Sequence, residues 1–138
     1  MNMSSFYLKV IAANRMFYSG RCRSVIIPDM DGEKEILAHH EDLVIAMMDG
    51  EMRFQEENST EWKHAVVGRG FAQIAHNRVT VLVETAESPE EIDIARAKEA
   101  LERAEEQLRQ KQSIQEYYHS SASLARAMTR LKVTSKYL

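Results

Sequence analysis

Glycine and proline both stop well before the end of this chain. All five glycines and both prolines of the 138 residues lie at or before Pro89, and neither type occurs beyond it. Glycine and proline mark turns and disfavour helix interiors, so their absence from a stretch rich in alanine and glutamate favours helix. The sequence therefore predicts two domains, a turn-rich domain at residues 1–87 and a helical domain at residues 88–138.

The first domain consists of short apolar runs separated by turn residues. The runs alternate or are rich in β-branched residues, and they lie at positions 6–12, 23–27, 35–37, 43–48, 51–55, 62–67, 71–75 and 79–84. Asp49-Gly50, between two of them, is typical of a two-residue hairpin, and His76-Asn77 indicates another turn. No helical run separates the strands, which disfavours a parallel sheet built from βαβ units. The pattern predicts an antiparallel β sandwich.

The second domain has two helix starts and two apolar seams. Residues 88–91 (Ser-Pro-Glu-Glu) form a capping box with proline at the first helical position, and residues 113–116 (Ser-Ile-Gln-Glu) form a second box. Apolar or small residues recur at heptad spacing at Ile94, Ala97, Leu101, Ala104 and Leu108, and then at Ile114, Tyr117, Ser121, Leu124, Met128 and Leu131. Two seams in succession predict an antiparallel two-helix hairpin at the C-terminal end.

This hairpin should be only marginally stable by itself. Its small seam residues bury little apolar area, and that burial must offset the entropy lost on ordering the chain. We therefore expect the hairpin either to dock on another surface or to move. Residues 113–138 carry four basic side chains and one acidic, so the second helix is basic on a chain whose net charge is −3.

Composition excludes several classes of protein. Hydrophobic residues make up 44% and charged residues 28%, as in ordinary globular domains. No apolar run approaches the roughly 18 residues of a spanning helix, and the first residues lack the pattern of a signal peptide, so we expect any membrane contact to be made through another protein. The single Cys22 fits a reducing compartment, and the negative charge disfavours binding to nucleic acid.

The chain lacks a recognisable pattern for catalysis or metal binding. Cys22 has no base nearby in sequence and is expected to be a buried or half-buried thiol. His39 and His40 are neighbours, and on a strand they would point to opposite faces, which disfavours a metal site. We therefore predict that the protein is not an enzyme in its own right.

Charged residues gather on the predicted helices. Asp93, Arg96 and Arg103 fall on one face of the first helix, and Arg126 and Arg130 lie four residues apart on the second. In an antiparallel hairpin the end of the second helix returns toward the start of the first. Guanidinium groups brought together in this way suit phosphates, although a solvated charged face with ordinary ion pairs explains the same spacing.

Several segments together resemble the epsilon subunits of bacterial rotary F-type ATP synthases. They are residues 79–87 (Val-Thr-Val-Leu-Val-Glu-Thr-Ala-Glu), 92–97 (Ile-Asp-Ile-Ala-Arg-Ala), 102–105 (Glu-Arg-Ala-Glu) and 126–131 (Arg-Ala-Met-Thr-Arg-Leu). The resemblance covers nearly the whole chain. It implies a sandwich of about ten short antiparallel strands followed by a C-terminal antiparallel two-helix hairpin.

The resemblance also implies a function. In such subunits the sandwich binds the gamma subunit of the central stalk and rests on the ring of c subunits, and it makes or breaks no bond itself. The hairpin inhibits ATP hydrolysis when it extends among the alpha and beta subunits. The expected location is peripheral, on the cytoplasmic face of the bacterial cell membrane, without insertion into it and without nucleic acid.

Some members of that family bind ATP on the folded hairpin as a regulatory ligand, with no cofactor required. The matching residues here are Glu87, Ile92, Asp93, Arg96, Ala97, Arg103, Arg126 and Arg130. The resemblance further implies contact with the rotor ring at Glu33 and His40, although the glycine and Pro-Gly pair usual in that loop are absent. The alternatives to a stalk subunit are a free-standing ATP-sensing protein and a small enzyme with a histidine site.

Overall fold

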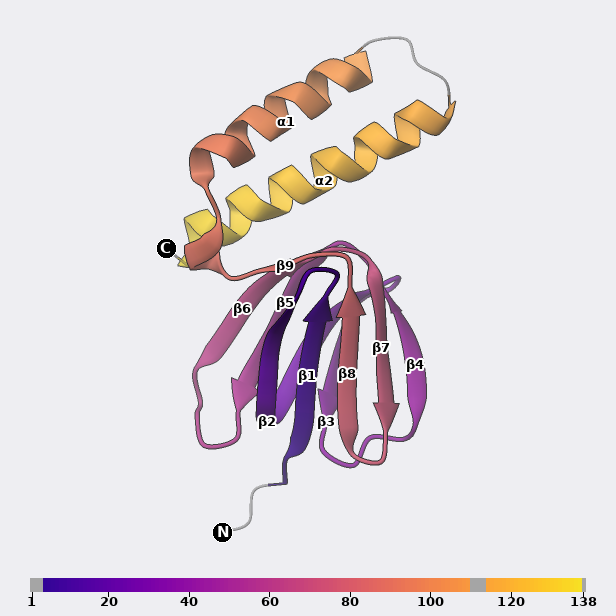
Figure 1. The fold of residues 1–138 in the computed structure, drawn as a ribbon, viewed down its shortest axis with the longest axis vertical. Coiled ribbons are helices and arrows are strands. Elements are labelled where there is room, and N and C mark those ends of the chain that lie inside the picture. The colour runs from indigo at the N-terminus through magenta and orange to yellow at the C-terminus, as the bar shows by residue number, and fades with distance from the viewer. Residues whose placement is uncertain (1–3, 110–113, 138) are drawn as a thin grey trace. The chain divides into compact units, whose positions relative to one another are not determined.

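The chain divides into two compact units, Met1–Glu87 and Ser88–Leu138, in a computed structural model that describes residues 4–109 and 114–137. The first unit is built of strands and the second of helices (Figure 1). The predicted β sandwich followed by two helices is confirmed.

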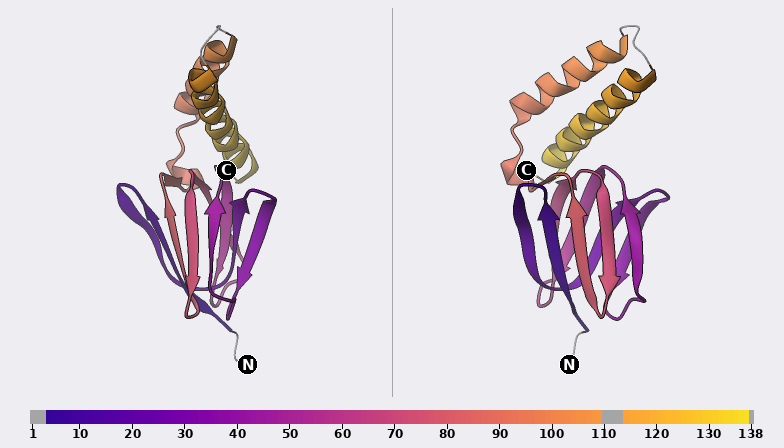
Figure 2. Two further views of the ribbon diagram at one scale, coloured as in Figure 1. Left: turned by 90° about the vertical axis from the view of Figure 1, so that its right-hand side faces the viewer. Right: turned by 45° about the vertical axis from the view of Figure 1, so that its right-hand side comes forward.

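The described part of the first unit contains nine strands. They are β1 (Phe6–Ala12), β2 (Arg15–Asp29), β3 (Gly32–Leu37), β4 (Leu43–Met47), β5 (Gly50–Glu56), β6 (Trp62–Val67), β7 (Gly70–Ala75), β8 (Arg78–Val83) and β9 (Ala86–Glu87). One layer has the order β1-β8-β7-β4, and β5, β6 and β9 continue the other. β2 joins the layers, because its first half pairs with β1 and its second half with β3 and β5 (Figure 2).

The neighbouring strands are antiparallel with one exception. β1 and β8 run parallel, from the pair Tyr7–Arg78 to the pair Ala12–Val83. The expectation of a purely antiparallel sandwich is therefore wrong at this pair. A parallel pair needs a long crossover, and here most of the sandwich lies between the two strands in sequence and supplies it without a helix.

The prediction of a hairpin at Asp49-Gly50 is also wrong. β4 pairs mainly with β7, whereas β5 pairs with β2 and β6, so the chain crosses here from one layer to the other. A two-residue hairpin turn of the Asp-Gly type needs positive φ at both central residues, and neither Asp49 nor Gly50 has it. His76 and Asn77 do, with φ of 51° and 59°, and they form the predicted turn between β7 and β8.

Alternating side chains fill the space between the layers. In β1 the buried residues Phe6, Leu8, Val10 and Ala12 alternate with half-buried ones, as expected for a strand with one face on the core. The largest fully buried side chains are those of Phe6, Leu8, Ile27, Ile36, Met47, Met52 and Ile74. The first half of β2 was missed by the sequence pattern because its residues are mostly exposed or half-buried.

The second unit begins with a 3₁₀ turn and continues as two antiparallel helices (Figure 1). These elements are η1 (Pro89–Glu91), α1 (Ile94–Arg109) and α2 (Ile114–Tyr137). Glu91 Oε1 accepts hydrogen bonds from the Ser88 backbone N–H at 3.2 Å and from its hydroxyl at 2.9 Å. The start signal at Ser88 therefore belongs to η1, and α1 begins later than predicted. Ser113, the first residue of the second predicted box, lies outside the described residues.

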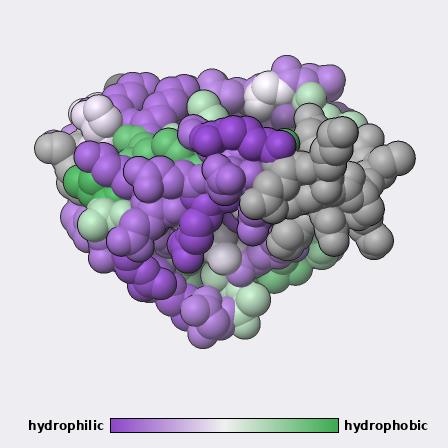
Figure 3. Space-filling view, turned by 90° about the horizontal axis from the view of Figure 1, so that it is seen from above, coloured by the Kyte–Doolittle hydropathy of each residue, from purple (hydrophilic) through white to green (hydrophobic). Residues whose placement is uncertain are grey.

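The seam of α1 is narrower than predicted. Ala97 and Ala104 are buried and Leu101 and Leu108 half-buried, but Ile94 is 46% exposed at the first position of the helix. Much of the remaining helix surface carries exposed charged residues. The space-filling view from above is correspondingly mostly hydrophilic (Figure 3).

The seam of α2 is displaced by one residue near its middle. Ala127 is 1% exposed, whereas the predicted seam residue Met128 is 56% exposed. A straight helix drifts by about 20° per heptad, so a strict heptad pattern places later residues on the wrong face. The side chains of Ile114 and Tyr117 lie outside those described. Small residues thus dominate the described buried positions of both helices, which supports a weakly stabilised hairpin.

Candidate functional site

The eight residues expected to hold ATP lie on the last strand and on the helical unit. Glu87 ends β9 in the first unit, and the other seven belong to the second. Ile92 and Asp93 link η1 to α1, Arg96, Ala97 and Arg103 lie on α1, and Arg126 and Arg130 lie on α2.

Asp93 caps the N-terminus of α1. Its Oδ1 accepts a hydrogen bond from the backbone N–H of Arg96 at 3.1 Å, and its carbonyl accepts the first helical bond from Ala97 at 2.9 Å. Ile92 before it is buried with extended backbone, and Ala97 is 4% exposed. The Ile-Asp-x-x-Arg-Ala sequence thus has a structural role as a helix start.

Removing this cap should weaken the hairpin. Asp93→Ala leaves the Arg96 N–H without its partner, so we expect the free energy of unfolding of the helical unit to fall by about 1 kcal/mol. Asp93→Asn keeps an oxygen that can cap and should stay close to the wild type. Urea unfolding followed by circular dichroism measures both, and equal losses in the two variants would contradict the capping role.

The arginines differ in their contacts. Arg96 and Arg103 are exposed and make no ion pair with any residue in the described parts of the chain, and the guanidinium of Arg126 donates to Ser123 Oγ at 3.2 Å. Arg109, by contrast, lies within 3.6 Å of Glu105 and 3.2 Å of Glu106. Guanidinium groups without carboxylate partners are suited to bind phosphate oxygens.

Glu33 and His40, the residues expected to meet a rotor ring, lie on β3 and in the connection to β4. Arg53 donates to both carboxylate oxygens of Glu33, at 2.6 and 3.3 Å, so this charge is already matched within the sandwich. His40 Nδ1 lies 2.9 Å from the carbonyl oxygen of Glu41. His39 and His40 both follow the end of β3, so the argument that they point to opposite faces of a strand does not apply to them.

The outer face of the β1-β8-β7-β4 layer carries an apolar row. The register aligns Ile11 with Leu82, Leu82 with Phe71, and Phe71 with Ala46. Val44 lies on the same face of β4, and Phe71 and Val44 are 44% and 62% exposed. Contiguous exposed apolar side chains mark surfaces that bind other macromolecules. These five residues are called the apolar row below.

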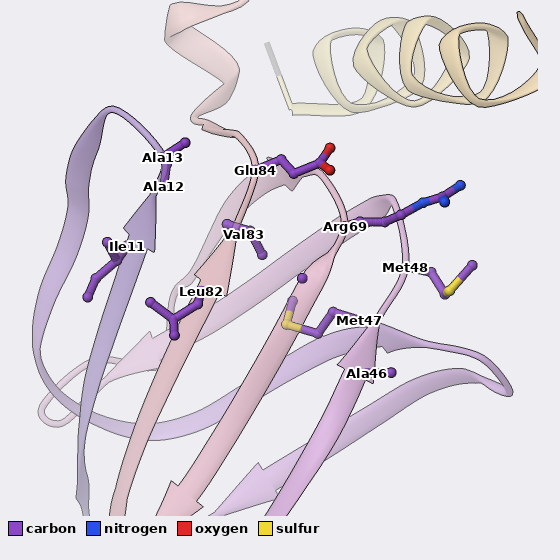
Figure 4. A pocket seen from close by; sticks show the side chains of 11 residues that line it. Ile11, Ala12, Ala13, Ala46, Met47, Met48, Arg69, Leu82, Val83 and Glu84 are labelled. Carbon is purple, nitrogen blue, oxygen red and sulfur yellow. The ribbon is translucent and has the colours of Figure 1, made fainter. Parts of the chain in front are cut away.

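A groove of about 850 Å³ adjoins the apolar row at the ends of the strands. Leu82 and Val83 line it together with Met47 and Met48, and the charged side chains of Arg69 and Glu84 lie at its upper end (Figure 4). The apolar run at positions 43–48 is buried at Met47, but Val44 and Met48 are 62% and 39% exposed. An apolar run that continues on the outer face of a layer is the signal that could have identified this surface.

The single cysteine of the chain, Cys22, lies in the core. Cys22 is fully buried, and burial raises the pKa of its thiol to about 11 while the Tyr18 hydroxyl 3.7 Å away lowers it. A thiol with so high a pKa is protonated at neutral pH and is a poor nucleophile. Within residues 4–109 and 114–137, no three histidine, cysteine or acidic side chains are placed to hold a metal ion. No helix in this part is both long and apolar enough to span a membrane.

Comparisons with known proteins agree along nearly the whole chain. Residues 5–89 match the family described as ATP synthase, Delta/Epsilon chain, beta-sandwich domain, and residues 90–135 match ATP synthase, Delta/Epsilon chain, long alpha-helix domain. The chain is 46% identical over 134 residues to the ATP synthase epsilon chain of Ruminiclostridium cellulolyticum, covering 97% of this chain and 98% of that one. It is 42% identical over 134 residues to the ATP synthase epsilon chain of Caldanaerobacter subterraneus subsp. tengcongensis, covering 96% of each.

Two solved structures have the same fold. A chain in the Euglena gracilis mitochondrial ATP synthase (OSCP/F1/c-ring) superposes with a TM-score of 0.79 at 21% identity, covering 94% of this chain and 81% of that one. A chain in the central stalk/c-ring structure of the Tetrahymena thermophila mitochondrial ATP synthase gives 0.70 at 8% identity, covering 97% and 99%. With family matches on both units and relatives above 40% identity, the chain belongs to the delta/epsilon chain family of the ATP synthase.

Proposed function

We propose that this protein is a non-catalytic subunit of the central stalk of a bacterial proton-translocating F-type ATP synthase. In this proposal the sandwich couples the gamma subunit to the c-ring, and the helical hairpin regulates ATP hydrolysis. The protein would then sit at the cytoplasmic face of the cell membrane, held there by its neighbours rather than by a segment of its own.

The observation that carries the stalk role is the apolar row. A subunit that only turns with a rotor needs a surface that stays bound to its neighbour, and buried apolar area is the usual source of such binding. Phe71 lies within the row, between Leu82 and Ala46. We assign the row to the gamma subunit because it is an extended, exposed apolar face of the sandwich.

Placing a charge in the row should break this contact. Phe71→Glu buries an unpaired carboxylate in the interface, so we expect the dissociation constant for gamma to rise about thirtyfold or more. Asn58→Glu adds the same charge on an exposed turn residue between β5 and β6 and should leave binding unchanged. Surface plasmon resonance measures the affinity of each variant for gamma. Equal affinities for the two variants would show that the apolar row is not part of the interface.

The regulatory role rests on the hairpin. Its buried described positions are dominated by small residues, so a difference of a few kcal/mol can move it between folded and extended states. α2 carries Arg126, Arg130 and Lys132, and a basic helix complements acidic surfaces such as those expected on the alpha and beta subunits. In the extended state the helix would contact these subunits and inhibit hydrolysis.

ATP is proposed as the ligand that holds the hairpin folded. Arg96, Arg103, Arg126 and Arg130 would bind the phosphates, and the first two make no ion pair within the described residues. Glu87 and Asp93 would contact the adenine or orient the arginines, with Ile92 and Ala97 shaping the start of α1. ATP that binds only the folded hairpin stabilises it by mass action. If the protein binds ATP but not gamma, the stalk role fails and a free-standing ATP sensor is the better account.

A further inference from the structure

The strand from which the chain leaves the sandwich is unusually short. β9 comprises only Ala86 and Glu87, and it joins the sheet through two residue pairs, Val66–Glu87 and Val67–Ala86. Immediately before it, the carbonyl of Thr85 accepts a hydrogen bond from the Gly68 N–H at 2.9 Å. A two-residue edge strand makes few backbone hydrogen bonds with its neighbouring strand. Its attachment to the sheet therefore depends on other contacts, such as those made by side chains.

Arg15 supplies such a contact from a distant part of the sequence. Its Nη2 donates to the carbonyl oxygen of Ala86 at 2.9 Å, across 71 positions of the chain. Its guanidinium carbon lies 5.5 Å from the centroid of the Phe17 ring, which holds the side chain in place. A hydrogen bond from a charged donor is stronger than one between neutral groups. Ala86 itself is 4% exposed.

We infer that Arg15 is a latch that holds β9 in the sheet and thereby sets the length of the tether between the sandwich and the helical unit. With the latch closed, the tether begins after Glu87. With β9 released, the Thr85 bond to Gly68 becomes the next fixed point, and the tether gains Ala86 and Glu87. Two residues of extended chain add roughly 7 Å of reach.

The latch also positions Glu87, one of the proposed ATP contacts. This consequence rests on the proposed function, because it requires that ATP bind the folded hairpin. Opening the latch would then do two things together: it would lengthen the tether and release Glu87 from its place on β9. The release of β9 itself does not depend on ATP or on any partner.

Hydrogen exchange of the full chain without ligand tests the latch directly. In Arg15→Ala we expect amides of residues 85–87 and their partners in 66–68 to exchange about tenfold faster, since a charged hydrogen bond is lost. Amides of β8 should keep their wild-type rates. Arg15→Lys retains a charged donor and should recover part of the protection.

A matched control is Arg21→Ala. Arg21 also donates to a backbone carbonyl, that of Ser5 at 3.1 Å, but it does not touch β9. Its loss should leave exchange at 85–87 unchanged. Unchanged exchange at 85–87 in Arg15→Ala, or an equal rise in every strand of the sandwich, would overturn the inference, because the second result means a general loss of stability.

The proposed effect of the latch on ATP binding is measured separately, by thermal unfolding with and without ATP. In Arg15→Ala we expect the increase of melting temperature by ATP to be smaller than in the wild type. If exchange at β9 rises as expected but the wild type shows no ATP effect, the latch stands and the ATP proposal fails. If the wild type responds to ATP and Arg15→Ala responds equally, the latch does not position Glu87.

Discussion

Replacing Gly70 by alanine is expected to lower the free energy of unfolding of the sandwich by about 3 kcal/mol. A Cβ at this position would lie 1.8 Å from the carbonyl oxygen of Leu82 and 2.8 Å from the Cα of Val83. These are backbone atoms of β8, with which β7 pairs, so the two strands would have to separate. Urea unfolding monitored by tryptophan fluorescence or circular dichroism measures the loss.

Gly20→Ala is the matched control for this effect. A Cβ at Gly20 would meet the hydroxyl of Tyr18 at 2.7 Å, which is the end of a side chain and not backbone, so a small side-chain shift relieves the contact without separating two strands. We expect a clearly smaller loss of stability than in Gly70→Ala. A Gly70→Ala protein within 1 kcal/mol of the wild type, on the order of an ordinary surface change, would show that β7 and β8 are not packed as described.

The second large effect is stabilisation by ATP. At a concentration one hundred times its dissociation constant, a ligand that binds only the folded form adds about 2.7 kcal/mol, so ATP at that concentration should raise the melting temperature by several degrees. Arg126→Ala removes a proposed phosphate contact and should abolish the increase. Differential scanning fluorimetry with and without ATP measures both proteins.

Two further variants separate loss of ATP binding from loss of stability. Arg109→Ala removes an α1 arginine that pairs with Glu105 and Glu106 and lies outside the motif, so its response to ATP should equal that of the wild type. Asp93→Asn is preferable to Asp93→Ala, because the alanine variant loses the helix cap as well as the carboxylate. A wild type that does not respond to millimolar ATP, or an Arg126→Ala protein that responds fully, would contradict nucleotide binding at these residues.

Local sequence patterns predicted where strands and turns lie better than they predicted which strands pair with each other. The alternation of buried residues in β1 and the His76-Asn77 turn follow from side-chain period and backbone φ, which nearby residues determine. The parallel pairing of β1 with β8 and the crossing at Asp49-Gly50 depend on which distant faces bury one another, and no short pattern carries that information.

For the candidate sites, too, local sequence patterns predicted some residues but not the contacts that these residues make. The motif around Asp93 was visible in the sequence, but its role as the cap of α1 required the hydrogen bond to Arg96. The apolar row was hidden because a strand such as 43–48 looks like core when neither face is polar. Met128 was placed on the seam by a strict heptad, whereas the helix turns Ala127 inward.

The most direct test of the stalk role is the binding of the full chain to the gamma subunit, measured by isothermal titration calorimetry. The account predicts a one-to-one complex whose formation has a negative heat-capacity change, because the apolar row is buried on binding. An absence of binding, or binding that persists unchanged in Phe71→Glu, would contradict it.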